Sequence, residues 1–245
     1  MNTGEKDRSQ RGGTDRSQRG DGDRSRQHEA LVSRLVADAH PVRRLWPPAV
    51  RMAVWMALAA ATAGVFAARN HLPTTGTRLS EPLFATQVAS LLVAACWCGW
   101  LTLCAAVPGR EPRTPAVVAT ILLVGSSILL AFGLAPETLG DPRSFVQTGT
   151  MCTGVTLGLG SIPWIAGLVA LRRGAPVGPR LAAALAGSAA LLTAAAAMRT
   201  VCPLGDARWH WLAWHVLPIA AAAVVSAALA HHLIRPQRKF DFEEA

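Results

Sequence analysis

Residues 181–198 read LAAALAGSAALLTAAAAM, a run without one charged side chain. A helix over such a run, at 1.5 Å per residue, comes close to spanning the roughly 30 Å hydrocarbon core of a bilayer. Because a backbone in lipid must satisfy its own hydrogen bonds, each run of this kind predicts a helix. The sequence therefore predicts an all-α membrane protein with six transmembrane helices within residues 49–234, over the apolar runs 50–68, 83–107, 115–135, 145–171, 181–198 and 209–234.

The overall composition agrees with this prediction. Among the 245 residues 51% are hydrophobic and only 16% are charged, against roughly 25% charged in a soluble domain. Of the 39 charged side chains, 18 lie in the first 51 residues. These proportions exclude a soluble enzyme with a large aqueous core. The net charge of +9 lies mostly beside the apolar runs, so we expect no direct nucleic-acid partner.

The basic residues indicate which way the helices run. Six crossings put both termini on one side, which then carries 19 of the 24 Lys and Arg residues. Cytoplasmic loops are enriched in these two residue types, so both termini are predicted to be cytoplasmic. The opposite side carries the remaining five, which are Arg69, Arg78, Arg143, Arg199 and Arg208.

The polar ends of the chain flank the predicted membrane domain. Residues 1–27 contain a degenerate repeat, with DRSQRG beginning at both Asp7 and Asp15, and have nothing apolar to bury. Such a composition predicts a disordered polar leader. Residues 235–245 are predicted to form a short cytoplasmic tail.

Residues 28–48 have a different pattern from the leader. Leu31 and Leu35 are spaced i, i+4 with Val32 and Val36 beside them, which predicts a short amphipathic helix. Pro41 ends it, since the residue before a proline avoids the α region. About three turns of helix are marginal alone in water and need a partner. That partner is another protein, the lipid surface or the chain's own membrane domain, and periodicity leaves all three open.

Cys152 and Cys202 are the most informative of the five cysteines. The predicted topology puts both at the outer face, one early in the fourth run and one just after the fifth. Three interpretations remain open, namely a structural disulfide, a redox- or metal-responsive pair, and unpaired thiols. Cys96 and Cys98 are two residues apart, so on a helix they point about 200° away from each other. We expect them to behave as small hydrophobic residues.

Other polar and small residues in the runs give weaker predictions. His210 is expected to face water at the membrane interface. His215 lies deeper and is expected to hydrogen-bond a neighbouring helix rather than bind metal with Cys202. Gly154 and Gly158 predict a close helix contact within the chain, with dimerisation as the alternative.

Missing motifs narrow the function further. The sequence has no P-loop, HExxH, CxxC or GxGxxG, and no Asp or Glu in the central part of a run. We therefore predict no enzyme, no catalytic residues and no small-molecule substrate.

Several short motifs occur in an order that resembles a known family. They are LVSRLVADAHPVRRL at 31–45, VPGR at 107–110, LRRGAP at 171–176, Cys202-Pro203 and WHxxP at 214–218, with Cys152 between them. The chain resembles the NrsF family, negative regulators of an extracytoplasmic-function sigma factor in bacteria. The resemblance runs from about Leu31 to Ile234, and the repeat at 1–27 lies outside it.

The resemblance implies an anti-sigma factor of the bacterial inner membrane, whose partners are an extracytoplasmic-function sigma factor and membrane lipid. Cys152 and Cys202 would sense heavy-metal or oxidative stress, with at most a transient heavy-metal ion and no resident cofactor. Arg43 and Arg44 either pair with acidic groups of the sigma factor or only flank the membrane. The implied sigma-binding residues are Leu31, Val32, Leu35, Val36, Pro41, Val42, Arg43, Arg44 and Leu45.

A rival from another class is a quinone-coupled membrane thiol oxidoreductase. It would pass electrons from the outer cysteines to Cys96 or Cys98. The missing CxxC motif and the opposed directions of Cys96 and Cys98 speak against it.

Overall fold

The computed structural model describes residues 28–34, 36–37, 46–133, 142–174, 176–204 and 207–234. The chain divides into two compact units, Met1–Arg44 and Leu45–Ala245. In the first unit, residues 28–34 and 36–37 are helical with exposed side chains. The predicted leader, the positions 38–45 and the predicted tail at 235–245 lie outside the described residues.

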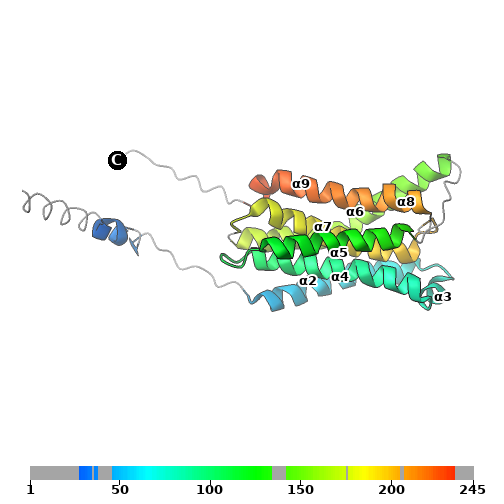
Figure 1. The fold of residues 1–245 in the computed structure, drawn as a ribbon, viewed down its shortest axis with the longest axis horizontal. Coiled ribbons are helices and arrows are strands. Elements are labelled where there is room, and N and C mark those ends of the chain that lie inside the picture. Colours follow the sequence, from blue (N-terminus) through cyan, green and yellow to red (C-terminus); the bar gives the residue numbers. More distant parts are fainter. Residues whose placement is uncertain are drawn as a thin grey trace, which may run out of the picture. The chain divides into compact units, whose positions relative to one another are not determined.

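The described part of the second unit consists of helices alone, as the sequence predicts (Figure 1). Most long helices begin with proline at the first helical position, where its missing N–H leaves no hydrogen bond unmade. In chain order the elements are α2 (Pro48–Asn70), α3 (Thr75–Leu79), α4 (Pro82–Ala105), α5 (Thr114–Gly133), α6 (Pro142–Arg173), α7 (Pro179–Val201), α8 (Arg208–Trp211), the π-helix η1 (Leu212–Val216) and α9 (Leu217–Ile234).

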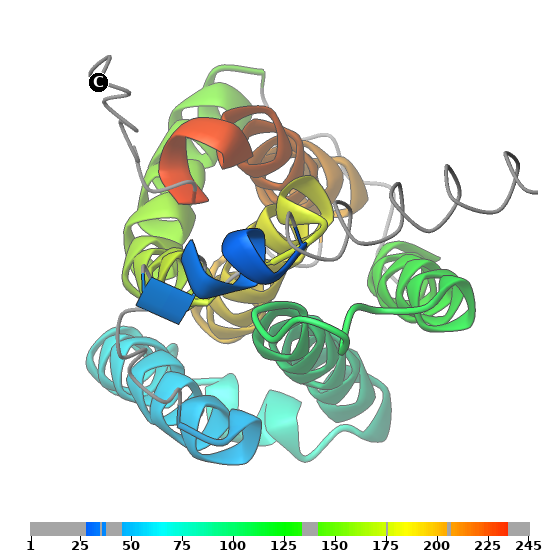
Figure 2. The ribbon, with the colours of Figure 1, turned by 90° about the vertical axis from the view of Figure 1, so that its left-hand side faces the viewer.

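Five helical segments of the described chain are long and apolar enough to cross a membrane. They are α2, α4, α6, α7 and the continuous segment Arg208–Ile234 that joins α8, η1 and α9. The third predicted run coincides with α5, whose apolar part Thr114–Leu130 is shorter. Five of the six predicted spans thus have the required length. Helix α5 packs against α4 at the edge of the bundle (Figure 2).

Helix α7 forms the centre of the bundle. It packs against α4, α6 and α9. In the apolar stretch of α7, 83% of the residues are buried, compared with 11% in the corresponding stretch of α2. Figure 2 shows the other helices around it. Alanine methyl groups let neighbouring backbones approach closely, so the run without charged side chains becomes the protein core rather than a lipid-facing span.

Glycine contacts differ from the sequence prediction. Among the described residues, a side chain at Gly154 or Gly158 would meet nothing within 4 Å, so the close contact predicted within the chain is wrong and dimerisation stays a prediction. The close approaches lie elsewhere on α6: a Cβ at Gly160 would overlap Leu191 of α7, and one at Gly149 would overlap the Trp214 indole. Two glycines four residues apart predict a helix face without protruding side chains, but they do not predict which helix packs against that face.

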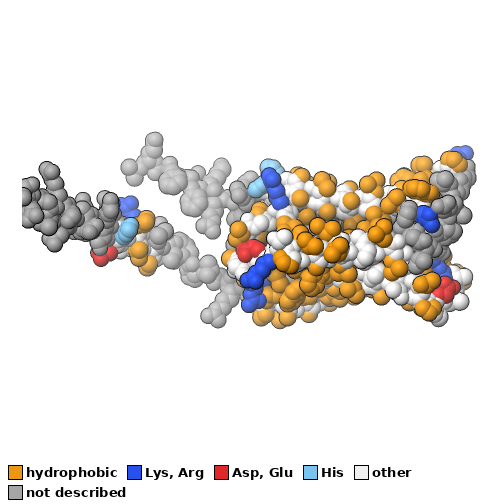
Figure 3. Space-filling view, viewed as in Figure 1, with side chains coloured by type: hydrophobic (Ala, Val, Ile, Leu, Met, Phe, Trp, Pro, Cys, Tyr) orange, Lys and Arg blue, Asp and Glu red, His pale blue; other side chains and the backbone are white. Residues whose placement is uncertain are grey.

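The surface has the distribution expected of a protein in a bilayer. Large aliphatic side chains on α5, α6 and α9 are exposed, for example Leu129 (68%), Ile165 (60%) and Val224 (69%). In the view of Figure 3, hydrophobic side chains cover the length of the bundle, and the charged side chains lie towards its two ends. Such a surface is unfavourable in water and favourable against lipid tails.

Candidate functional site

Cys152 and Cys202 lie together at one end of the bundle. Cys152 is on the third turn of α6, and Cys202 is the first residue after α7. Their Sγ atoms are 3.5 Å apart, and both residues are free thiols and buried, at 6% and 1% exposed. The structure thus brings together the two cysteines that the topology assigned to the same face.

Two histidines complete the cluster. His210 Nε2 lies 3.5 Å from Cys202 Sγ, and His215 Nδ1 lies 3.5 Å from Thr156 Oγ1 of α6. Both imidazoles are 0% exposed. The expectation that His210 faces water is wrong, because Phe145 from the first turn of α6 lies edge-on against its ring, with centroids 6.0 Å apart. The predicted fourth run already included Phe145, but the sequence did not show that this ring would cover His210.

The π-helix explains how the two histidines meet. They are five residues apart, so on a regular α-helix they would point about 140° away from each other. The wider turn at Leu212–Val216 returns residues five apart to the same face. Such π-turns are frequent at functional sites.

A proline and a threonine accommodate this irregular turn. Pro218 has no N–H to offer the carbonyl of Trp214, four residues earlier. Thr153 Oγ1 of α6 donates a hydrogen bond to that carbonyl instead, at 3.0 Å. The residue after Cys152 therefore ties α6 directly to the turn that carries His215.

The four side chains form one compact donor set. One ligand atom from each of Cys152, Cys202, His210 and His215 lies within 4.8 Å of the other three, and all four residues are buried. Cysteine sulfur and histidine nitrogen are the donors that zinc and softer metal ions prefer.

Aromatic and cationic groups surround this set. Trp211 stacks on His215 with centroids 4.7 Å apart, and the Arg199 guanidinium lies 5.3 Å from the centre of the Trp211 ring. Arg199 is buried and donates to Gln87 Oε1 of α4 at 2.7 Å. A positive charge, held in position by this hydrogen bond to α4, therefore lies near the thiol pair.

The environment opposes ionisation of Cys202 while no ligand is bound. The neighbouring Cys152 thiol and burial both raise the pKa of Cys202, and the positive charge of Arg199 acts in the opposite direction. These contributions favour the neutral, protonated thiol of Cys202 over the thiolate. A bound metal ion would have to displace that proton.

The remaining cysteines do not join the cluster. Cys98 is buried in the core, whereas Cys96 lies on the outside of α4 with its Sγ 3.4 Å from Met56 Sδ. The opposed directions expected for this pair are confirmed.

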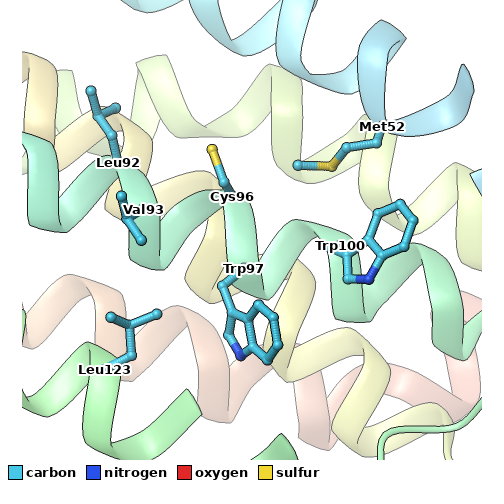
Figure 4. A pocket seen from close by; sticks show the side chains of 7 residues that line it. All are labelled: Met52, Leu92, Val93, Cys96, Trp97, Trp100 and Leu123. Atoms are coloured by element: carbon cyan, nitrogen blue, oxygen red, sulfur yellow. The ribbon is translucent and has the colours of Figure 1, made fainter. Parts of the chain in front are cut away.

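Cys96 also borders an open groove of about 480 Å³ between α2, α4 and α5 (Figure 4). Its lining is almost wholly apolar, and the Trp97 indole N–H donates to Thr120 Oγ1 at 3.0 Å. The oxidoreductase interpretation therefore gains no support here. The groove is lined by Met52, Leu92, Val93, Cys96, Trp97, Trp100 and Leu123.

The predicted sigma-binding residues are described only in part. Leu31, Val32 and Val36 lie on helical backbone and are 56%, 57% and 69% exposed. Within the Met1–Arg44 unit this leaves an apolar face available for a partner. The other predicted residues, Leu35, Pro41, Val42, Arg43, Arg44 and Leu45, lie outside the described residues.

Comparison with known proteins adds one finding. The family described as NrsF, negative regulator of sigma F, matches residues 35–235. The matched range contains all four residues of the cysteine–histidine cluster but begins after Leu31 and Val32. No curated protein and no solved structure is detectably similar to the chain. Since the match covers most of the sequence, the chain belongs to the NrsF family, the negative regulators of sigma F.

Proposed function

We propose that the chain is an anti-sigma factor of the bacterial inner membrane that holds an extracytoplasmic-function sigma factor and releases it under heavy-metal or oxidative stress. Family membership supplies the negative regulation and a sigma-factor partner. The observation that carries the stress response is the pair of buried free thiols, Cys152 and Cys202, with sulfurs 3.5 Å apart. Two such thiols can share a soft ion, or can give two electrons and two protons to an oxidant and form a disulfide.

The proposed topology has six membrane crossings and both termini in the cytoplasm. Helix α2 begins and α9 ends at one end of the bundle, while α3 and α8 lie at the other (Figure 1). The Thr75 hydroxyl donates to the Thr200 carbonyl at 3.0 Å, which ties α3 to the end of α7 beside Cys202. The positive-inside rule favours the cytoplasm for the end where α2 begins, so the thiols would face the periplasm.

Added cysteines would test this topology. Ser80, before α4, and Val177, between α6 and α7, are both exposed. In a variant whose five native cysteines are serine, Ser80→Cys should react with a membrane-impermeant maleimide in intact spheroplasts. Val177→Cys should react only after the membrane is broken. The opposite pattern would reverse the proposed direction of signalling.

A physical connection links the thiols to the sigma-binding segment. Cys152 lies on α6, whose Pro163 carbonyl accepts a hydrogen bond from Trp55 Nε1 of α2 at 2.9 Å. Helix α2 begins at Pro48, where the proposed sigma-binding segment 28–48 ends. A shift of α6 at the thiol end would thus reach the helix that carries the segment. To change from mostly bound to mostly free sigma factor, the two states must differ by roughly 5 kcal/mol in affinity.

Cell fractionation tests the proposal directly. The extracytoplasmic-function sigma factor that this chain binds should sediment with the membrane when the full-length chain is present. It should move to the soluble fraction after brief exposure to Cd²⁺ or to a thiol oxidant. A sigma factor that stays soluble in the presence of the chain, before any stress, contradicts the proposal.

A further inference from the structure

We propose that Cys152, Cys202, His210 and His215 together form a tetrahedral centre for a divalent ion of the zinc group. This inference rests on the proposed sensor function and deepens it in two ways. It adds two histidines to the cysteine pair, and it specifies the class of ion.

The spacing of the donor atoms fits such an ion. Zinc–sulfur bonds of about 2.3 Å and zinc–nitrogen bonds of about 2.0–2.1 Å put the ligand atoms of a tetrahedral site about 3.4–3.8 Å apart. The Cys152 and Cys202 sulfurs are 3.5 Å apart, and His210 Nε2 is 3.5 Å from Cys202 Sγ. All four ligand atoms lie within 4.8 Å of one another, so small shifts of the side chains would complete the tetrahedron.

The histidines have few other partners. His215 Nε2 and His210 Nδ1 are buried and have no hydrogen-bond partner among the described residues. A polar group taken out of water without a partner costs free energy, and buried imidazoles are usually hydrogen-bonded. Two buried imidazoles beside two thiols therefore cost free energy if the site never binds a ligand. A ligand bond from His215 Nε2 to an ion would offset part of that cost, while His210 would bind the ion through the Nε2 that faces Cys202.

The cluster is held in place by its surroundings. The π-turn brings His210 and His215 to one face, and Trp211 stacks on His215 with centroids 4.7 Å apart. Thr153 fixes that turn to α6 through the Trp214 carbonyl. Ligands positioned before binding lose little conformational entropy when the ion arrives.

Charge balance favours a divalent ion with this donor set. On binding, each thiol releases its proton to solvent, and two thiolates with two neutral imidazoles around a divalent ion are neutral overall. A neutral centre suits a buried site. Two sulfur and two nitrogen donors favour Zn²⁺ or Cd²⁺ and disfavour Mg²⁺ and Ca²⁺, which need oxygen ligands.

Cobalt spectroscopy tests the ligand set. The purified full-length chain, reduced and in lipid nanodiscs, would be titrated with Co²⁺. We expect one equivalent to bind, with the strong visible bands of tetrahedral cobalt and charge-transfer bands from thiolate, and Zn²⁺ or Cd²⁺ should bleach both. Weak octahedral bands, or binding that Mg²⁺ displaces, would overturn the proposal.

Histidine variants separate four ligands from two. His210→Gln and His215→Gln should each weaken Co²⁺ binding by about a hundredfold, since one of four ligands is lost. His232→Gln, at an exposed position of α9, is the matched control and should bind normally. Circular dichroism and size-exclusion chromatography would confirm that each variant is folded. Unchanged spectra and affinity in both His210→Gln and His215→Gln would show that histidine takes no part.

The same variants distinguish the inference from the proposed function. If both variants bind Co²⁺ as the native chain does and still release the sigma factor under Cd²⁺, the cysteine pair senses alone and the four-ligand centre is refuted. If the native chain binds Co²⁺ tetrahedrally but neither Cd²⁺ nor a thiol oxidant releases the sigma factor, the centre stands and the sensor function is refuted.

Discussion

The double variant Cys152→Ser, Cys202→Ser is expected to keep the sigma factor on the membrane under Cd²⁺ and under thiol oxidants alike. Serine oxygen is a poor ligand for soft ions and cannot form a disulfide, so both forms of the signal lose their target. Repression without stress should be unchanged, because the sigma-binding segment is untouched. A sigma-dependent reporter measures this result as loss of all induction.

Matched cysteine variants control for a general loss of thiols. Cys96 and Cys104 are partly exposed free thiols on α4, outside the cluster. Cys96→Ser combined with Cys104→Ser should leave induction normal. Normal induction in the Cys152→Ser, Cys202→Ser variant, with the protein present in the membrane at native amounts, would remove the sensor role from this pair.

The second large effect is expected at the N-terminal helix. Changing Leu31, Val32 and Val36 to alanine in the full-length chain should release the sigma factor without stress. The three changes remove seven methyl or methylene groups from the exposed apolar face, and at about 0.8 kcal/mol each, with half of that burial realised, about 3 kcal/mol of binding is lost. That corresponds to a hundredfold weaker Kd, to order of magnitude, measurable by co-purification and by the reporter.

The opposite face of the same helix provides the control. Ala30 and Ala37 are helical and exposed, and they lie away from Leu31 and Val32 around the helix. Ala30→Gln with Ala37→Gln should therefore leave the sigma factor bound. Equal loss of binding in the control and the alanine variant would show that helix formation matters and the apolar face does not.

The sequence allowed correct predictions of those features that the surrounding lipid or water determines. Apolar runs of the right length predicted the helices, because lipid demands them of any chain that spans it. The same topology put Cys152 and Cys202 at one end of the bundle, where the structure finds their sulfurs 3.5 Å apart.

The histidines show where that reasoning ends. On a regular α-helix with 3.6 residues per turn, His210 and His215 would point in different directions. The π-turn brings them to the same face. The one available signal was the five-residue spacing followed by Pro218, which leaves the Trp214 carbonyl without its helical donor. Likewise, Gly154 and Gly158 met the sequence pattern for close contact, whereas Gly149 and Gly160 make the contacts. Which face of α6 meets a neighbour depends on the packing of the whole bundle.

The alanine-rich core helix has a mechanical consequence. Where α6 meets α7, much of the surface of α7 is methyl groups, and Leu191 is a longer side chain that fits over Gly160. Smooth contacts of this kind resist separation but oppose sliding only weakly, which is the geometry of a shear motion. A helix is stiff along its axis, so a small pull at the thiol end of α6 would arrive at Pro163 and Trp55 as a translation of similar size. A displacement of α6 could then be transmitted from one end of the bundle to the other while the helices stay packed.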